Sequence, residues 1–496
     1  MPQLIPYSEY RPDVADYSSP YSAFIQNVLP RGDGYGPFKD FGAFSQALPA
    51  QCRGFFKALK TDGSVSLFAG TSNKLYQMNN TTGAWTDVSK GSSTYSALPS
   101  TDNWQFWQFG NFVKATQVNA PQQLFDLTSS TNFQDTLGSP PQARYGSVIN
   151  RFEILSGLSA NPYRILWSGL NDVNSASAYT SGVNSSDFQD LPDGGIVRGV
   201  GGGEFGNIYQ DTTVRRITFM PGSATVMQIQ RIAEDVGMYS AGSLIKAAGR
   251  QFFYSTSGFQ MIDASGALTP IGKERVDRTF LTDLDTGNLQ LFQGASDPRS
   301  SRVFWAYKSI AGSANAFDKI LWYDWALDRW GPVMMTGEFL GSLGRPGITL
   351  EGLDSISSSI DALVPSLDSF ALAGTPELAM FNTSHILGFF SGQNLEAKLD
   401  TAEFDRPSLD GNAGGMFFRG WRPIADASGV AGTMLYRSNQ STTASSSSEK
   451  TQDSFGRVNL RRDAKFAKMR DRIPAGTTWT YAKGVIPDVS PSGTHG

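Results

Sequence analysis

The segment Leu75-Tyr76-Gln77-Met78 is a short aromatic and apolar run, and a polar turn separates it from Trp85. The same plan recurs three times, and each time a large apolar residue follows the turn. The recurrences are Leu124-Phe125-Asp126-Leu127 to Phe133, Phe259-Gln260-Met261-Ile262 to Ile271, and Trp322-Tyr323-Asp324-Trp325 to Trp330. The first two copies start roughly 49 residues apart, within the ~40–50-residue period of propeller repeats. We therefore interpret each copy as the outer hairpin of a β-propeller blade, in which the large residue clamps a neighbouring blade.

The composition also favours β structure. The chain has 496 residues, which is too long for one simple core. Charged residues make up 17%, below the ~25% usual for soluble domains, while aromatic residues reach 12% and there are 52 glycines. Short strands joined by glycine-rich turns are typical of all-β proteins. Low charge beside many aromatic side chains indicates that partners cover part of the surface.

The net charge and the small numbers of cysteine and histidine residues argue against several kinds of binding and catalytic site. A net charge of −4 argues against a chain that binds nucleic-acid phosphates over its whole surface, although DNA could still pass through a lumen. Cys52 is the only cysteine, and His385 and His495 are the only histidines. We expect no catalytic, cofactor or metal site. The N-terminus lacks the features of a secretory signal, and no apolar run reaches ~18 residues, so we expect no membrane insertion by this chain.

The chain divides into three predicted regions. Residues 1–50 contain seven prolines and are expected to form an extended arm that lies across the protein's own body or a neighbouring subunit. Residues 51–400 form the propeller, with about six or seven blades and an inserted linker or short amphipathic helix near 349–370. Residues 401–496 form a small β-sandwich-like domain.

Two motif types offer alternatives to a purely structural role. Gly201-Gly202-Gly203-Glu204-Phe205-Gly206 matches a dinucleotide fingerprint, but a strand-like run follows where that fingerprint needs a helix. We interpret it as a glycine-rich crossing of close backbones. Carboxylates occur in pairs at Asp190 and Asp193, Glu234 and Asp235, and Asp283 and Asp285. Glycosidases use two carboxylates, so a glycoside hydrolase or a glycan-binding propeller remains an alternative. Asp283-x-Asp285 resembles only the start of a calcium-binding loop, because the later ligands are absent. The hydrogen bonding of a polar turn explains these residues better.

The strongest charge feature lies near the C-terminus. Residues 457–472 carry seven basic residues and two aspartates. Lys468, Arg470 and Arg472 alternate, so a strand would place them on one face. One interpretation is a basic stripe that faces DNA or an acidic subunit, and the other is an ordinary solvated strand face.

Several short motifs, in order, resemble the tail hub or nozzle proteins of short-tailed bacteriophages, also called packaged-DNA stabilisation proteins. The resemblance covers about residues 15–340. It rests on Asp16-Tyr17, Asn27-Val28-Leu29-Pro30, Gly32-Asp33-Gly34-Tyr35-Gly36-Pro37, Phe68-Ala69-Gly70-Thr71 with Leu75-Tyr76, Trp104 and Phe106 with Phe109-Gly110, Trp167-Ser168-Gly169, Asp193-Gly194-Gly195, and Phe253-Tyr254 with Gly258-Phe259.

This resemblance implies a structural virion protein rather than an enzyme. Such proteins are propellers that assemble as a hexameric ring below the portal and its adaptor, extend the DNA channel, help to retain the packaged genome and carry fibres or spikes. It further implies a homohexamer in the phage tail, assembled in the host cytoplasm, with genomic DNA passing through the lumen. A receptor-binding propeller at the tail tip is the alternative.

Overall fold

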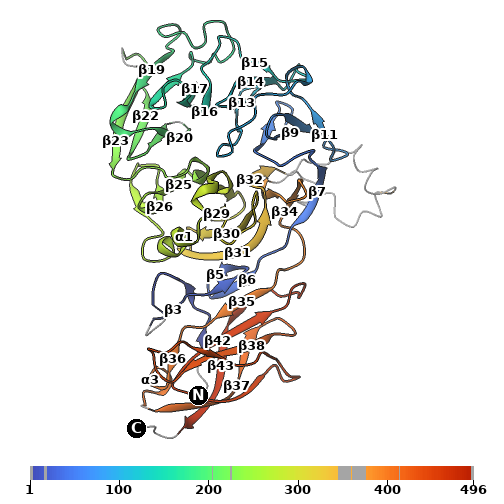
Figure 1. The fold of residues 1–496 in the computed structure, drawn as a ribbon, viewed down its shortest axis with the longest axis vertical. Helices are drawn as coiled ribbons and strands as arrows, with labels where there is room; N and C mark the ends of the chain where they lie inside the picture. The colour runs from blue at the N-terminus through green and yellow to red at the C-terminus, as the bar shows by residue number, and fades with distance from the viewer. Residues whose placement is uncertain are drawn as a thin grey trace.

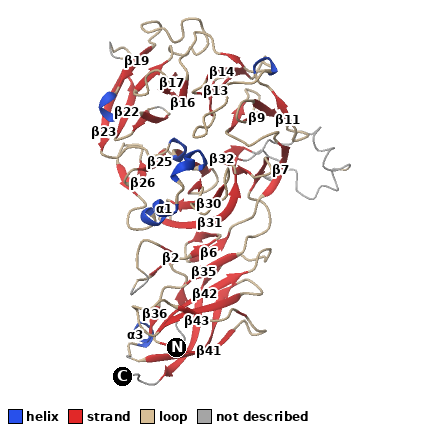
Figure 2. Ribbon diagram, viewed as in Figure 1, coloured by secondary structure: helices blue, strands red, loops and turns tan. Residues whose placement is uncertain are grey.

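The computed structural model describes residues 4–15, 19–203, 205–223, 226–344, 359, 376–412 and 414–492. Over these residues the regular structure is mostly β, and it forms two units. One is a ring of four-stranded sheets, and the other is an elongated pair of sheets beside the ring (Figure 1). Helices are few and short, and they lie at the ends of strands (Figure 2).

The ring contains seven four-stranded antiparallel sheets within the described residues. The first three are β8 (Phe55–Leu59), β9 (Val65–Gly70), β10 (Leu75–Met78) and β11 (Trp85–Asp87); β12 (Gln105–Phe109), β13 (Phe112–Gln117), β14 (Ala120–Asp126) and β15 (Gln134–Asp135); and β16 (Ala143–Ile149), β17 (Phe152–Leu158), β18 (Arg164–Trp167) and β19 (Asp187–Asp190).

The next three sheets follow the same order of strands along the chain. They are β20 (Val197–Gly201), β21 (Gly206–Gln210), β22 (Thr213–Phe219) and β23 (Met227–Glu234); β24 (Ile245–Ala247), β25 (Arg250–Ser255), β26 (Gly258–Ile262) and β27 (Leu268–Pro270); and β28 (Gln293–Asp297), β29 (Arg302–Tyr307), β30 (Phe317–Asp324) and β31 (Arg329–Gly337). Short helices join them: η1 (Lys90–Ser92), η2 (Pro192–Gly194), η3 (Ala241–Ser243), α1 (Asp277–Asp283) and η4 (Thr286–Leu291).

The seventh sheet closes the ring. It contains β32 (Phe339–Gly344), β33 (Pro376–Phe381), β34 (Ile386–Phe389) and β7 (Gly42–Ala47), and β7 precedes the first sheet in sequence. β34 pairs with β7 antiparallel, and β32 contacts β8 of the first sheet. The start of the ring is therefore held to its end by backbone hydrogen bonds. The insertion predicted near 349–370 lies, apart from Ser359, outside the described residues, as do Asp16 and Tyr17.

The repeated hairpins of the sequence are the outer hairpins of four sheets, as predicted. They coincide with β10–β11, β14–β15, β26–β27 and β30–β31, each the third and fourth strands of its sheet. Their large residues contact the preceding sheet: Phe133 lies 5.6 Å from Phe68, Trp330 5.1 Å from Phe259, and Trp85 5.8 Å from Phe381, measured between ring centroids. The prediction of an all-β, propeller-like unit is confirmed at this level.

The second unit is a sandwich of two antiparallel sheets. The first sandwich sheet contains β41 (Val458–Ala464), β37 (Gly415–Ala425), β43 (Ala482–Ser492), β6 (Gly34–Pro37), β5 (Val28–Arg31) and β1 (Ile5–Pro6). The second contains β39 (Ser445–Ser446), β38 (Ala431–Arg437), β42 (Phe466–Ile473), β35 (Ala397–Asp400), β4 (Ile25–Gln26), β36 (Phe404–Asp405) and β40 (Lys450–Thr451). A short helix, α3 (Arg406–Asp410), follows β36.

The proline-rich N-terminal region does not form a separate arm along its length. The structure distributes it over both units: β1, β5 and β6 join one sandwich sheet, β4 joins the other, and β7 joins the ring. The parallel pair β2 (Glu9–Tyr10) and β3 (Tyr21–Ser22) lies between them, with β2 against β31. Prolines permit this because short edge segments lose few ladder hydrogen bonds. The sandwich thus contains residues from both ends of the chain.

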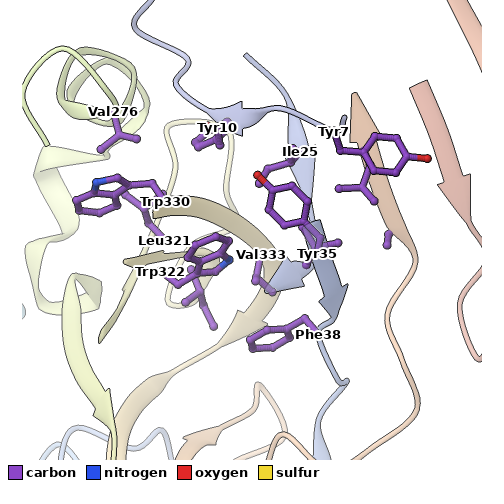
Figure 3. Close-up of a cluster of buried hydrophobic side chains, with 14 of the residues drawn as sticks. Tyr7, Tyr10, Ile25, Tyr35, Phe38, Val276, Leu321, Trp322, Trp330 and Val333 are labelled. Carbon is purple, nitrogen blue, oxygen red and sulfur yellow. The ribbon is translucent and has the colours of Figure 1, made fainter. Parts of the chain in front are cut away.

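Buried side chains of the N-terminal region connect the two units (Figure 3). Tyr10, Ile25 and Phe38 lie in one continuous apolar cluster with Trp322 and Trp330 of the ring and with sandwich residues. The Phe38 ring is 6.2 Å from that of Phe304 on β29. Burial of these side chains makes the joint between ring and sandwich a continuation of the core.

Asn27 is a polar residue of this joint that bonds to both units. Its side-chain amide donates to Glu396 O at 2.8 Å, ahead of β35, and its Oδ1 accepts from Met334 N of β31 at 2.7 Å. Its backbone N donates to Pro332 O at 3.1 Å. The residue adopts φ 58°, a left-handed conformation that asparagine tolerates better than most residues. Asn27 therefore holds both units through one side chain.

We expect Asn27→Ala to lower the free energy of unfolding by about 3 kcal/mol, because it removes two buried hydrogen bonds and strains the left-handed backbone. Asn27→Gly is the matched control: it loses the same hydrogen bonds but accepts the backbone conformation, so its loss should be about 1 kcal/mol smaller. Urea unfolding of the three proteins measures both differences. Equal stability of all three would contradict this role for Asn27.

A buried carboxyl lies at a second contact of the N-terminal region, within the sandwich. Asp471 on β42 accepts from the Tyr7 hydroxyl at 2.6 Å and from the Trp421 indole at 2.8 Å. Burial raises the pKa of Asp471 to about 7, against the opposing effect of these two hydrogen bonds. The fully buried Asp400 adds a like charge nearby.

This raised pKa predicts a pH dependence of stability. In the unfolded chain the carboxyl has a pKa of about 4, so between pH 4 and 7 the folded protein binds the proton more tightly. The stabilisation is complete below about pH 4 and is lost as the pH rises through 7. Relative to Asp471→Asn, which cannot ionise, the wild type should lose on the order of 4 kcal/mol between pH 4 and pH 8. Parallel stability curves for the two proteins would show that Asp471 does not titrate in this range.

Candidate interaction surface on the sandwich

The basic run predicted to carry function folds into two strands of different sheets. Residues 458–464 form β41, the edge of the first sandwich sheet, and residues 466–473 form β42, an inner strand of the second. The run therefore does not make one continuous basic surface, because its two halves lie on opposite sheets of the sandwich.

Lys468, Arg470 and Arg472 alternate on β42 with buried Met469, which places the three on one face, as predicted. Arg470 donates to both oxygens of Asp400, at 2.7 and 2.8 Å, and Lys468 Nζ lies 3.9 Å from Asp400 Oδ2.

The remaining contacts of this stripe also lie within the chain. Arg472 donates to Glu449 Oε1 at 2.6 Å and to Glu396 Oε2 at 3.2 Å. The Arg470 guanidinium also lies 3.9 Å from the ring centre of Phe24, in the N-terminal region. Carboxylates of the same chain thus neutralise this stripe, and it helps to fix β42 to β35 and to the N-terminal segment.

Other arginines of the sandwich are exposed and carry no such partner. On β37, buried Met416, Phe418 and Trp421 alternate with exposed Arg419 and Arg422. Arg461 lies on the neighbouring β41, opposite the β-bulge that contains Arg419. For these three guanidinium groups the described residues offer no hydrogen bond or ion pair.

The surroundings of these arginines suit contact with another protein. Half-buried Phe417 on β37 and Ile486 on β43 lie in the same sheet, and Phe455, in the turn before β41, is 82% exposed. Arginine and aromatic residues are enriched at protein interfaces, whereas lysine is depleted. We call this surface, defined by Phe417, Arg419, Arg422, Arg461 and Ile486, the arginine face.

The sequence did not single out the arginine face, although a signal was present. Met416, Phe418 and Trp421 mark the buried side of a strand, and the intervening arginines must then point outward. The count of basic residues favoured 457–472 instead. The sequence could not show that Asp400, Glu396 and Glu449, which are more than 20 positions away from their partners, would neutralise three of the seven basic residues of that run.

The paired carboxylates considered for catalysis are engaged with cations. Asp190 accepts from Arg164 at 2.6 and 2.8 Å, and Asp193 accepts from Arg215 at 2.5 Å. The hydrogen bonds from these arginines lower the pKa of both aspartates. Both carboxyl groups are therefore ionised at neutral pH, unlike the general acid of a glycosidase, whose pKa is raised.

Most of the remaining acidic candidates behave in the same way, whereas the Asp235 side chain has no hydrogen bond or ion pair with the described residues. Asp285 pairs with Lys308 at 2.6 Å and accepts from Gly287 N at 2.9 Å, the arrangement of an Asx turn that begins η4. Asp283 accepts from Tyr307 and Lys319, and Glu234 pairs with Arg231. Among the described residues no group of three or more His, Cys, Asp or Glu side chains could hold a metal ion.

The glycine motif lies between two antiparallel strands, β20 and β21, rather than between a strand and a helix. Gly203 forms a backbone bridge with Ile149 of the neighbouring sheet, and a Cβ on Gly202 would lie 2.2 Å from Val148 O. The glycines therefore allow two backbones to cross closely, as the sequence predicted, and the context of a dinucleotide site is not met.

Comparisons with known proteins give a likeness at the level of solved structures. No family model matches the chain, and no curated protein matches its sequence. The chain is similar to BamB from Moraxella catarrhalis, with a TM-score of 0.35 and 11% identity over 64% of this chain and 87% of that one. It is also similar to a quinonprotein alcohol dehydrogenase-like protein from Bacteroides thetaiotaomicron, with a TM-score of 0.35 and 10% identity over 57% and 67%.

A computationally designed protein, Ika8, gives a TM-score of 0.35 and 10% identity over 69% of this chain and 97% of that one. Values this low carry no argument about function, so the likeness to phage tail proteins stays a prediction. Across the described part of the chain, the helices are all too short or too polar to cross a bilayer.

The two sets of arginines should differ in what they contribute to stability. We expect Arg470→Gln to lower the free energy of unfolding by about 3 kcal/mol, because it removes the bidentate partner of a fully buried carboxylate. Arg461→Gln is the control on the arginine face and should change stability by less than about 0.5 kcal/mol. Chemical unfolding of both variants tests this, and similar losses would show that the division between stripe and face is wrong.

Proposed function

We propose that this protein is a structural component of the tail of a short-tailed bacteriophage, a hub or nozzle subunit. The observation that carries the proposal is that motifs on which the resemblance rests meet one another at joints between sheets. The motifs on which the resemblance rests therefore have packing roles in the ring, which supports the proposal.

The clearest joint connects the first two sheets. Phe68-Ala69-Gly70-Thr71 ends β9, and Trp104 precedes β12. The Trp104 indole donates to Thr71 O at 2.8 Å, and a Cβ on Gly70 would lie 2.4 Å from the Trp104 ring. Glycine is therefore required where the tryptophan crosses the strand.

A second motif also has a packing role. Leu75 of β10 is buried in the same apolar cluster as Trp104, and Phe253-Tyr254 with Gly258-Phe259 form the β25–β26 hairpin. Tyr254 and Phe259 contact each other with ring centroids 4.8 Å apart, and Phe259 lies 4.7 Å from Trp305 of the next sheet. These residues serve assembly of the scaffold, which suits a structural protein.

In this proposal the seven sheets are the blades of a seven-bladed propeller, closed by β7 as the fourth strand of the last blade. Six chains form a closed ring below the portal and adaptor, since heterologous contacts between identical subunits close into rings when the rotation permits. This assembly of six chains extends the DNA channel, helps to retain the genome and anchors fibres or spikes. The function of the hexamer then depends on its closure and on the shape of its lumen, rather than on reactive groups.

The arginine face supplies a surface for one of these contacts. Three unpaired arginines beside Phe417 and Ile486 favour an acidic protein surface as the partner. Such a surface is offered by a neighbouring virion protein, either another tail component or the adaptor. Because the arginine face lies on the sandwich, the sandwich makes the assembly contacts and the ring of sheets serves as the scaffold.

The proposal predicts that the purified chain forms hexamers or is incorporated into phage tails. Native mass spectrometry measures the first, and negative-stain microscopy of virions with a labelled chain measures the second, with the label expected below the portal. A chain that stays monomeric at high concentration and is not found in virions would overturn the proposal.

The variant Arg419→Gln, Arg422→Gln, Arg461→Gln tests the arginine face within this proposal. We expect it to fold normally and to reduce incorporation at least about tenfold, because desolvated arginine contacts each contribute on the order of 1 kcal/mol or more. The matched control is Arg151→Gln, Arg250→Gln, Lys273→Gln, at three positions on the ring of sheets. It should leave incorporation unchanged. Equal incorporation of both variants would exclude the arginine face as an assembly contact.

A further inference from the structure

A cavity of about 340 Å³ lies at one end of the ring. Its walls come from the beginnings of the first strands of five consecutive sheets, or from the segments just before them, at residues 101–105, 144–145, 196–198, 239–242 and 286–290. Gln117 and Val118 complete the walls. First strands of most neighbouring sheets contact one another, as β12 and β16 or β24 and β28 do, so they line the centre of the ring. The cavity volume falls in the lower part of the ~300–1,000 Å³ range of small-molecule sites.

The walls of the cavity are fastened by hydrogen bonds within the chain. Arg53 donates to the carbonyl of Pro99 at 3.1 Å and to Asn103 Oδ1 at 3.0 Å, which fixes the loop before β12. The Asn103 amide donates to Gln290 O at 2.8 Å and so joins this loop to η4 across the opening. The cavity is therefore formed in advance, which lowers the entropic cost of binding.

Two arginine–aspartate pairs define the chemistry of the lining. Arg144 Nε donates to Asp102 at 2.9 Å, and Arg198 Nε donates to Asp211 at 2.6 Å. Each contact uses only the Nε–H, and the described residues accept no hydrogen bond from the terminal guanidinium nitrogens of either arginine. These nitrogens remain available as donors in a fixed planar arrangement.

Neutral polar groups complete the lining. The hydroxyl of Tyr145 has no hydrogen-bond partner within the described structure, and burial raises its pKa to about 12, so it stays protonated at neutral pH. Gln105 also lines the cavity without a side-chain hydrogen bond to the described residues. The buried Oε1 of Gln290 is an acceptor without a partner there. An unpaired buried polar atom such as this Oε1 is costly, and a polar ligand would satisfy it.

The charges of the lining indicate which ligand fits. Arg144, Asp102 and Arg198 line the cavity, and Asp211, outside the lining, pairs with Arg198. The four charges sum to zero, so a charged ligand would bring an uncompensated charge into the cavity. Val118, Leu289 and Tyr239 add apolar surface beside the donors and acceptors. A ligand that combines many hydroxyl groups with apolar C–H faces matches both features.

We propose that the cavity at the end of the ring binds a neutral saccharide, with Arg144, Arg198, Tyr145 and Gln105 as hydrogen-bonding residues. The inference goes beyond the tail assignment and does not depend on it, since it concerns the isolated chain. In a tail protein, such a site would add recognition of a surface glycan to a structural role.

Saturation-transfer NMR of the purified chain tests the site, with methyl glycosides of glucose, galactose, mannose and N-acetylglucosamine and their neutral disaccharides as probes. Sialyllactose is the charged comparator. We expect transfer to at least one neutral probe and a Kd about tenfold weaker in Tyr145→Phe and in Gln105→Ala, because each loses one hydrogen bond in a desolvated site. Tyr163→Phe, at an exposed tyrosine outside the cavity, is the control and should bind as the wild type does.

Three results would overturn the proposal: no transfer to any neutral probe at millimolar concentration, transfer to sialyllactose alone, or binding unchanged in both cavity variants. Thermal melting of each variant shows whether it is folded. The tail assignment is judged from assembly into hexamers or virions, so either proposal can fail without the other.

Discussion

The N-terminal region, residues 5–47, is the constraint on which the rest of the structure depends. It supplies strands to both sandwich sheets and the last strand of the ring, and its tyrosines and phenylalanines extend one apolar core from ring to sandwich. A segment bonded to three sheets cannot leave one of them without exposing backbone groups that need partners. The two units are therefore stabilised together. Asn27 is a polar point at which they are joined, and Tyr7 fastens the N-terminal region to β42 within the sandwich.

Within the ring, stability comes from large side chains that reach the preceding sheet. Trp330 illustrates the arrangement: its ring packs on Phe259, and its indole donates to Ile271 O at 3.0 Å, so one residue makes both an apolar and a polar contact with its neighbour. Aromatic residues suit this role because they bury much area and have a defined geometry. A ring built in this way holds its centre and its outer surface rigidly, and both are then available as binding surfaces.

The distribution of charge separates structural from exposed groups. Several acidic residues of the sandwich are matched to a cation, as Asp400 is to Arg470 and Glu403 to Arg437. A buried carboxylate without its partner is strongly destabilising, which explains why the predicted basic stripe belongs to the fold. The unmatched arginines lie on the outer side of the first sandwich sheet, where no such requirement exists. Burial, rather than the number of basic residues, decides which of them can meet a partner.

The sequence by itself determined the local pattern. Aromatic runs separated by polar turns specify outer hairpins, because a strand, a turn and a clamping residue are close neighbours along the chain. It also determined that Gly202 and Gly203 lie at a backbone crossing. Tertiary structure alone decided that β7 closes the ring, that the ends of the chain share a sandwich, and that Asp400 neutralises Arg470. Each of these pairs residues that are 70 or more positions apart, and a hydrogen bond or ion pair over that separation leaves no periodic trace in the sequence.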